Sequence, residues 1–83
     1  MTPSMTHDQI LAALTQIFRT VLDDDTLVLT PETTAADVPG WDSMNHITIV
    51  VEVENHFGIK VRTAEIEALR NVGDFVKLIA AKQ

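Results

Sequence analysis

The stretch Gly40–Ile47, with the sequence Gly-Trp-Asp-Ser-Met-Asn-His-Ile, decides the fold of this chain. Asp42 and Ser43 are residue types that favour helix N-caps, and the apolar-rich run that follows them is closed by Gly58, a common helix terminator. The pattern predicts a loop that leads into a helix over residues 42–57. The Ser43 hydroxyl would then lie at the positive end of the helix dipole, where phosphate groups bind readily, although a serine there is most often only a cap.

The composition of this same run conflicts with its helical boundaries. Apolar β-branched residues alternate with polar ones, which is typical of a strand. The caps, the glycine and a length beyond that of an ordinary strand favour a helix. These local rules leave the two interpretations evenly balanced. The alternating residues are Ile47, Thr48, Ile49, Val51, Glu52, Val53 and Glu54.

A family resemblance favours the helix. The triplet Asp42-Ser43-Met44, followed by an apolar segment that ends Glu-Asn-His-Phe-Gly-Ile over residues 54–59, resembles the Asp-Ser-Leu region of acyl carrier proteins, with Met44 in place of leucine. The resemblance extends over almost the whole chain. It implies an all-α four-helix bundle with a long first loop and a short third helix, and a serine that carries 4′-phosphopantetheine.

We expect one carrier domain over residues 1–83, with helices at about 6–22, 42–57, 63–69 and 71–81. The first helix has a capping box, in which Thr6 is the N-cap and Gln9 lies three residues later. Thr63 and Asn71 are the expected caps of the last two helices, and Gly73 weakens the final one. The apolar stripe of the first helix is Ile10, Leu14, Ile17, Phe18 and Val21, and that of the last is Val72, Phe75, Val76, Ile79 and Ala80.

The loop over residues 23–41 is long for so small a domain. The aspartate run at 23–25 opposes the helix dipole and should end the first helix. A calcium loop is disfavoured because the glycine and distal glutamate of an EF-hand are missing. The expected anchors of the loop to the core are Leu27, Val28, Leu29, Val38 and Trp41.

Winding residues 42–57 at about 100° per residue separates two apolar stripes. Ile49, Val50, Val53 and Phe57 form the natural core stripe. Met44, Ile47 and Val51 form a second stripe, and Ser43 and Glu54 lie between the two. The second stripe would be either covered by the loop or exposed beside Ser43 as a docking surface for enzymes.

Composition narrows the choice of partners. The 83 residues contain six Lys plus Arg against twelve Asp plus Glu, for a net charge of −6, and no cysteine. The acidic balance argues against nucleic acid and anionic membrane surfaces. No apolar run is long enough for stable membrane insertion, and we expect a cytoplasmic monomer. Without cysteine, only a prosthetic group would supply the thiol that a carrier needs.

Two sites with their own chemistry are disfavoured. Asp42, Ser43 and His46 would make a hydrolytic cluster only with an oxyanion hole and an enclosed pocket, for which the sequence has no G-x-S-x-G signal. Glu52 and His56 lie four residues apart and would share a metal only with a third ligand. We expect no catalytic residue and no resident metal.

The resemblance implies a carrier rather than an enzyme. A phosphopantetheinyl transferase would use coenzyme A and Mg²⁺ to attach 4′-phosphopantetheine to Ser43, with Asp42 as the helix cap and a supporting metal ligand during transfer. The product is a phosphoprotein whose thiol bears acyl or aminoacyl groups as thioesters. It would present them to acyl-loading, acyl-transfer or condensing enzymes of lipid or polyketide biosynthesis. Recognition would involve Met44, Ile47, Val51 and Glu54.

Two further expectations concern specialisation. Thr48, Asn55 and His56 stand where fatty-acid carriers often have acidic residues, which favours a carrier dedicated to one pathway. The absence of flanking linkers favours a free-standing protein. The competing interpretation is a small unmodified helical interaction domain in which Ser43 only caps a helix.

Overall fold

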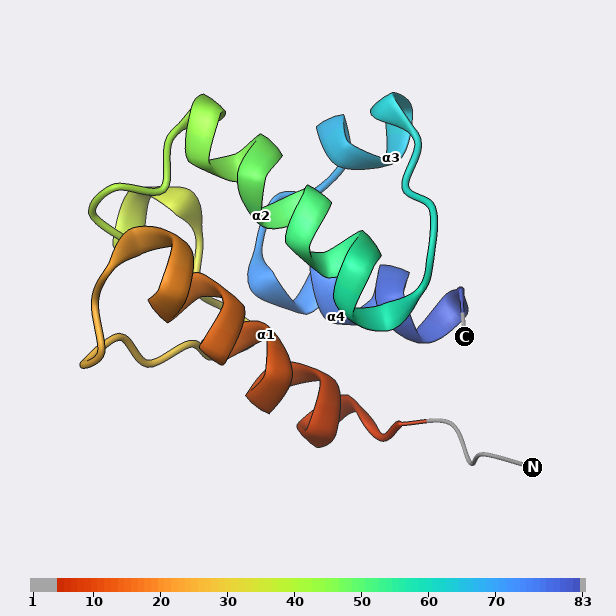
Figure 1. Cartoon of the computed structure of the whole chain (residues 1–83), viewed down its shortest axis with the longest axis horizontal. Helices are drawn as coiled ribbons and strands as arrows, with labels where there is room; N and C mark the ends of the chain where they lie inside the picture. The colour runs from red at the N-terminus through yellow and green to blue at the C-terminus, as the bar shows by residue number, and fades with distance from the viewer. Residues whose placement is uncertain (1–4, 83) are drawn as a thin grey trace.

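The computed structural model describes residues 5–82, and over these residues the protein is all-α (Figure 1). Four helices form the bundle, and a short 3₁₀ turn interrupts the first loop. This confirms the predicted fold class. The elements are α1 (His7–Leu22), η1 (Ala35–Asp37), α2 (Ser43–Phe57), α3 (Thr63–Glu67) and α4 (Val72–Ala81).

The caps of α1 explain both of its ends. The Thr6 hydroxyl accepts the backbone N–H of Gln9 at 3.2 Å, and the Gln9 side chain accepts the N–H of Thr6 at 2.8 Å, as the capping-box pattern predicts. At the other end, Asp23 adopts the left-handed conformation with φ 53° and donates its N–H to the Arg19 carbonyl. The helix therefore ends at the start of the aspartate run.

The long loop is held to α1 by contacts that the sequence pattern only partly indicates. Leu29 and Val38 are buried, as expected, and Leu27 is half-buried. Val28, which was also expected to anchor the loop, is 70% exposed, because the extended backbone turns its side chain away from its buried neighbour. The Arg19 Nε–H donates to the Leu27 carbonyl at 2.7 Å, a contact that no pattern in the sequence indicates.

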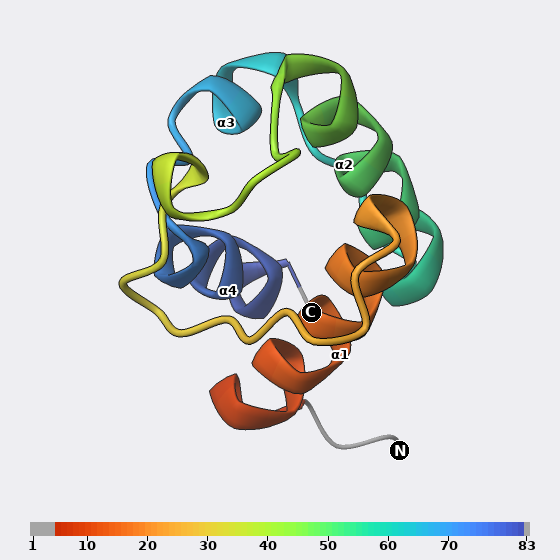
Figure 2. The same ribbon diagram turned by 90° about the vertical axis from the view of Figure 1, so that its left-hand side faces the viewer.

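The second half of the loop runs against the beginning of α4, as Figure 2 shows. The N–H of Val72 donates to the Thr33 carbonyl at 2.9 Å, and the N–H of Gly73 donates to the Pro31 carbonyl at 2.8 Å. A Cβ at position 73 would lie 2.9 Å from that Pro31 oxygen. The lack of a side chain at Gly73 thus permits the close approach of loop and helix, although glycine has a low helix propensity.

Burial on α2 resolves the conflict between strand and helix. Ile49, Val50 and Val53 face the core at helical spacing and are at most 3% exposed. Phe57 closes this stripe and is half-buried. Fifteen continuous helical residues with Asp42 as N-cap and Gly58 as C-cap place the alternating β-branched residues on opposite sides of one helix.

The interior is built on aromatic contacts between distant segments. The ring of Phe18 on α1 meets Trp41 edge to face at a centroid distance of 4.8 Å and Phe75 on α4 at 6.5 Å. Both separations fall in the favourable range for aromatic pairs. The residue before the Asp-Ser pair is therefore fixed by the core itself.

The last two helices differ in how they begin. Asn71 caps α4 by accepting the N–H of Asp74 at 2.8 Å, as predicted. The expected cap of α3, Thr63, is instead its first helical residue, and Arg62 occupies the N-cap position. The Glu65 carboxylate accepts the Arg62 N–H at 2.9 Å, which closes the turn one residue earlier. Among residues 5–82, no helix is both long and apolar enough to cross a membrane.

Candidate functional site

Ser43 lies at the start of α2 with its side chain in solvent. The N-cap is Asp42, whose carboxylate accepts the N–H of Asn45 at 2.9 Å. The Ser43 hydroxyl makes no hydrogen bond to any residue between 5 and 82. The interpretation of Ser43 as a mere helix cap is therefore wrong, because its neighbour performs that function and leaves the hydroxyl free.

The turn that delivers Ser43 is rigidly tied to α2. Gly40 has a φ of +87°, which favours glycine, and its carbonyl accepts both the N–H of Asp42 at 3.0 Å and the amide Nδ2–H of Asn45 at 2.6 Å. The exposed hydroxyl thus stands on a well-ordered loop-to-helix junction.

One turn further along α2, His46 binds back to the loop. Its Nδ1 accepts the indole Nε1–H of Trp41 at 3.0 Å, and the two rings lie 5.9 Å apart. Burial lowers the pKa of His46 below 6.5, and the nearby backbone of Ile66 acts in the opposite direction. Because Nδ1 is occupied by Trp41, and Ser43 makes no bond to the imidazole, the hydrolytic cluster is not formed.

A groove of about 490 Å³ opens beside Ser43. Ser43 and Ile47 line it from α2, Ile66 lines it from α3, and Leu69 and Arg70 line it from the segment between α3 and α4. Its lining is largely apolar and includes the charged residues Asp42, Glu67 and Arg70. The groove joins the start of α2 to a segment far away in the sequence.

The second apolar stripe of α2 is exposed. Met44, Ile47 and Val51 are 82%, 53% and 46% exposed, and we refer to these three residues as the α2 patch. They follow Ser43 along one side of the helix. The alternative in which the loop covers this stripe is excluded by these exposures.

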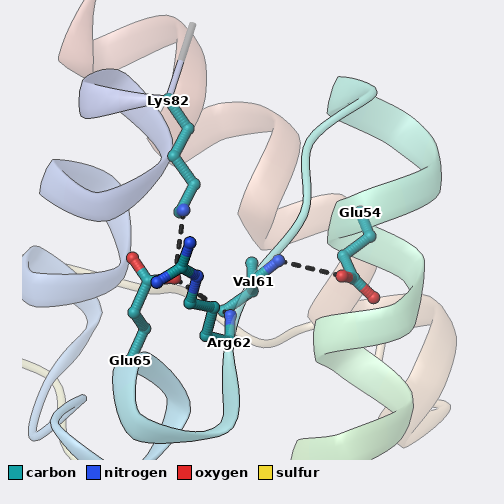
Figure 3. A network of polar contacts seen from close by, with 5 residues as sticks. All are labelled: Glu54, Val61, Arg62, Glu65 and Lys82. Carbon is teal, nitrogen blue, oxygen red and sulfur yellow. Dashed lines mark hydrogen bonds and ion pairs between the residues drawn. The ribbon is translucent and has the colours of Figure 1, made fainter.

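Glu54 lies at the other end of α2 and is half-buried. Figure 3 shows its carboxylate directed at the backbone of the segment before α3, where it accepts the N–H of Val61 at 2.9 Å. The same view shows the ion pair between Lys82 and Glu65, with a distance of 3.0 Å. Glu54 therefore fixes the connection from α2 to α3, whatever else it does.

The described part of the chain holds no group of three or more His, Cys, Asp or Glu side chains arranged for a metal ion. Glu52 and His56 line a separate groove of about 310 Å³ against α1. In the aspartate run, Asp24 accepts both the N–H and the hydroxyl of Thr26. These two bonds lower the pKa of the Asp24 carboxyl and close a turn. Asp24 therefore has a local structural role that needs no calcium ion.

Comparison with known proteins identifies the family of this chain. The family described as "Phosphopantetheine attachment site" matches residues 12–79. The chain belongs to the acyl carrier protein family. The domain in these residues accordingly carries acyl groups on covalently attached 4′-phosphopantetheine, and this domain is a carrier rather than an enzyme.

Individual acyl carriers resemble this chain along most of its length. An acyl carrier protein from Micrococcus luteus is 36% identical over 76 residues, covering 92% of this chain and 94% of the relative. The meromycolate extension acyl carrier protein of Mycobacterium leprae is 30% identical over 92% of this chain, which spans only 66% of that relative's length. A solution structure of a holo acyl carrier protein from Geobacter metallireducens is 48% identical, with a TM-score of 0.83 over 88% of this chain and 84% of that one.

The site fits the prosthetic group that the family implies. A phosphodiester requires a serine hydroxyl that is exposed and not engaged elsewhere, and the arm requires open space beside it. Ser43 meets the first requirement, and the groove of about 490 Å³ meets the second. The chain has no cysteine of its own, so the carrier's thiol must come from the group.

Several residues around this site have positions that the sequence does not indicate. The pattern suggests His46 only as a catalytic partner of Ser43, whereas the imidazole ties α2 to Trp41. No pattern singles out Arg70, although this residue lines the same groove as Ser43. A helical spacing of three residues indicated the position of His46, but no local pattern links residues 43 and 70.

Proposed function

We propose that Ser43 is the residue that carries the 4′-phosphopantetheine of this acyl carrier. The single observation that carries the proposal is that Ser43 is the only serine between residues 12 and 79, and that its hydroxyl is exposed and unbonded at the start of α2. The other serine in the sequence is Ser4, outside the matched residues.

Attachment requires little from the chain besides a presented nucleophile. A phosphopantetheinyl transferase with Mg²⁺ joins Ser43 Oγ to the phosphorus of coenzyme A that bears the pantetheine. The pyrophosphate bond breaks, adenosine 3′,5′-bisphosphate leaves, and the hydroxyl proton passes to a base of the transferase. Asp42 holds the first turn of α2 in place. Its carboxylate, next to the reacting hydroxyl, would support the Mg²⁺ of the transferase. The attached group then supplies a thiol that holds acyl cargo as a thioester.

The α2 patch, with Glu54, is the proposed recognition surface for partner enzymes. Exposed apolar groups surrounded by polar ones mark interaction sites, and Met44, Ile47 and Val51 follow Ser43 along the helix. Glu52 and Glu54 are the only carboxylates within α2. With few charges on this helix, the apolar contacts take a large share of recognition.

The partners would be the transferase and the enzymes that load, transfer or condense acyl or aminoacyl groups. We favour a carrier dedicated to one pathway of lipid or polyketide synthesis. The similarity to meromycolate extension carriers supports such a specialised role in lipid synthesis, alongside the similarity to relatives named only as acyl carrier proteins. A monomeric state and a cytoplasmic location stay predictions.

The test is modification in vitro by a broad-specificity transferase with coenzyme A, followed by intact-mass measurement. We expect the wild-type protein and Ser4→Ala each to gain the mass of one phosphopantetheine, and Ser43→Ala to gain none. Circular dichroism of the apo proteins checks that Ser43→Ala is folded. A wild-type protein that stays unmodified by several transferases would instead support the unmodified interaction domain.

A further inference from the structure

Arg70 is the only Lys or Arg among the residues that line the groove beside Ser43. It lies between α3 and α4, and its side chain is exposed. Its backbone N–H donates to the Asp74 carboxylate at 3.1 Å, which fixes the main chain at this position. Its guanidinium has no hydrogen bond or ion pair with any residue between 5 and 82. A cation with a fixed base and a free head group therefore stands in the groove.

The charges around Ser43 favour a cation next to a phosphodiester at this position. Asp42 and Glu67 line the same groove, so a phosphate on Ser43 would join two carboxylates. The N-terminus of α2 favours an anion, but only weakly at an exposed position. An arginine forms strong, charge-assisted and often bidentate hydrogen bonds to phosphate. Arg70 is the group in the groove with the chemistry to offset the added negative charge.

We propose that the Arg70 guanidinium pairs with the phosphodiester of the arm and that this contact directs the first part of the arm into the groove. The inference rests on the proposed attachment at Ser43 and adds a positioning residue to it. The contact leaves the arm next to the apolar side chains of Ile47, Ile66 and Leu69, which line the same groove. It also joins the segment before α4 to the start of α2 in the holo form only, because the apo form has no phosphate.

The experiment compares apo and holo protein for the wild type, Arg70→Gln, Arg70→Lys and Lys60→Gln. Lys60 is an exposed cation just beyond the C-terminal end of α2, which is about 22 Å long, so its loss changes the net charge equally without touching the groove. Intact mass first establishes that each holo sample carries one group. The measured quantities are the ³¹P chemical shift of the phosphodiester and the ¹H–¹⁵N shift of the arginine Nε resonances.

We expect the Arg70 Nε resonance to shift between the apo and holo forms of the wild type. We expect the ³¹P resonance of Arg70→Gln to move to that of free phosphopantetheine esters, with Arg70→Lys intermediate and Lys60→Gln equal to the wild type. In 1 M salt, where the Debye length is about 3 Å, the difference between the wild type and Arg70→Gln should shrink.

Three results would overturn the inference. A ³¹P shift that is the same in holo wild type and holo Arg70→Gln would show that Arg70 does not hold the phosphate, and would leave attachment at Ser43 intact. An Arg70 Nε resonance that is identical in apo and holo protein would point to a constant pairing with Glu67 or Asp42 instead. A protein that gains no phosphopantetheine at all would sink the proposed function and this inference together.

Discussion

The two apolar stripes of α2 have similar residues and opposite environments. Ile49, Val50 and Val53 are at most 3% exposed, whereas Met44, Ile47 and Val51 are at least 46% exposed. A helix that served only the fold would need one stripe. The difference teaches that only the inner stripe holds the bundle together, while the outer stripe is exposed beside Ser43, where we propose that partner enzymes contact it.

A matched pair of isoleucines gives the largest expected effect. Ile49 is fully buried and Ile47 is 53% exposed, two positions away on the same helix. We expect Ile49→Ala to lower the free energy of unfolding by about 2–5 kcal/mol, because it removes buried methyl groups and leaves a cavity. We expect Ile47→Ala to change it by only about 0.5 kcal/mol. Urea unfolding followed by circular dichroism measures the free energy of unfolding of both variants. Equal losses would contradict the claim that only the inner stripe stabilises the bundle.

For modification by a partner enzyme we expect the opposite order of effects, with the larger loss from the substitution of the exposed isoleucine. We expect Ile47→Ala to lower the kcat/KM for modification by a phosphopantetheinyl transferase about tenfold, equivalent to about 1.4 kcal/mol, as for the loss of an interface anchor. Ile49→Ala, assayed at a temperature where it is folded, should be modified like the wild type. Wild-type kinetics for Ile47→Ala would remove the α2 patch from recognition by that enzyme.

The smallest expected effect concerns His46, which lies on α2 at the edge of the interior. Burial lowers its pKa in the folded protein below 6.5, so the unfolded chain binds the proton more readily. The stability that neutral His46 contributes is therefore complete above pH 6.5 and is lost as the pH falls through the lower, folded-state pKa. The carboxyls of Asp24 and Glu65, whose pKa values are also lowered, titrate in a more acidic range.

Urea unfolding at a series of pH values between 7.5 and 5 tests this sign. We expect the free energy of unfolding of the wild type to decrease with falling pH, and that of His46→Gln to depend on pH less steeply. His56→Gln, at an exposed position on the same helix, is the control and should keep the wild-type slope. A wild-type slope in His46→Gln would mean that the burial of His46 does not govern the pH dependence of stability.

Local patterns were sufficient for the helices and their caps. Thr6, Asp42 and Asn71 cap the helices because each acts on a backbone N–H three residues away, and the apolar spacing places the core residues. The residues of α2 alone did not distinguish a strand from a helix, because its β-branched residues alternate as in a strand and also fall on two faces of a helix. The family resemblance was needed to favour the helix. The prediction of Thr63 as the N-cap of α3 was wrong, because the Glu65 carboxylate accepts the N–H of Arg62 and closes the first turn from that residue instead.

The remaining features depend on residues that are distant in the chain. The bond from Arg19 to Leu27, the close approach of Gly73 to Pro31 and the position of Arg70 beside Ser43 follow from how the loop and helices pack. None of them has a periodic or local signal. Exposure of the α2 patch likewise required the course of the loop, which leaves Met44, Ile47 and Val51 uncovered.

The central claim is that Ser43 bears the arm, and mapping the group within the holo protein tests it most directly. Trypsin cleaves after Arg19 and Lys60, and the peptide spanning residues 20–60 contains Ser43 as its only serine. We expect tandem mass spectrometry to find the phosphopantetheine on this peptide, at residue 43. A group found on the peptide with Ser4, or on a threonine, would contradict the account.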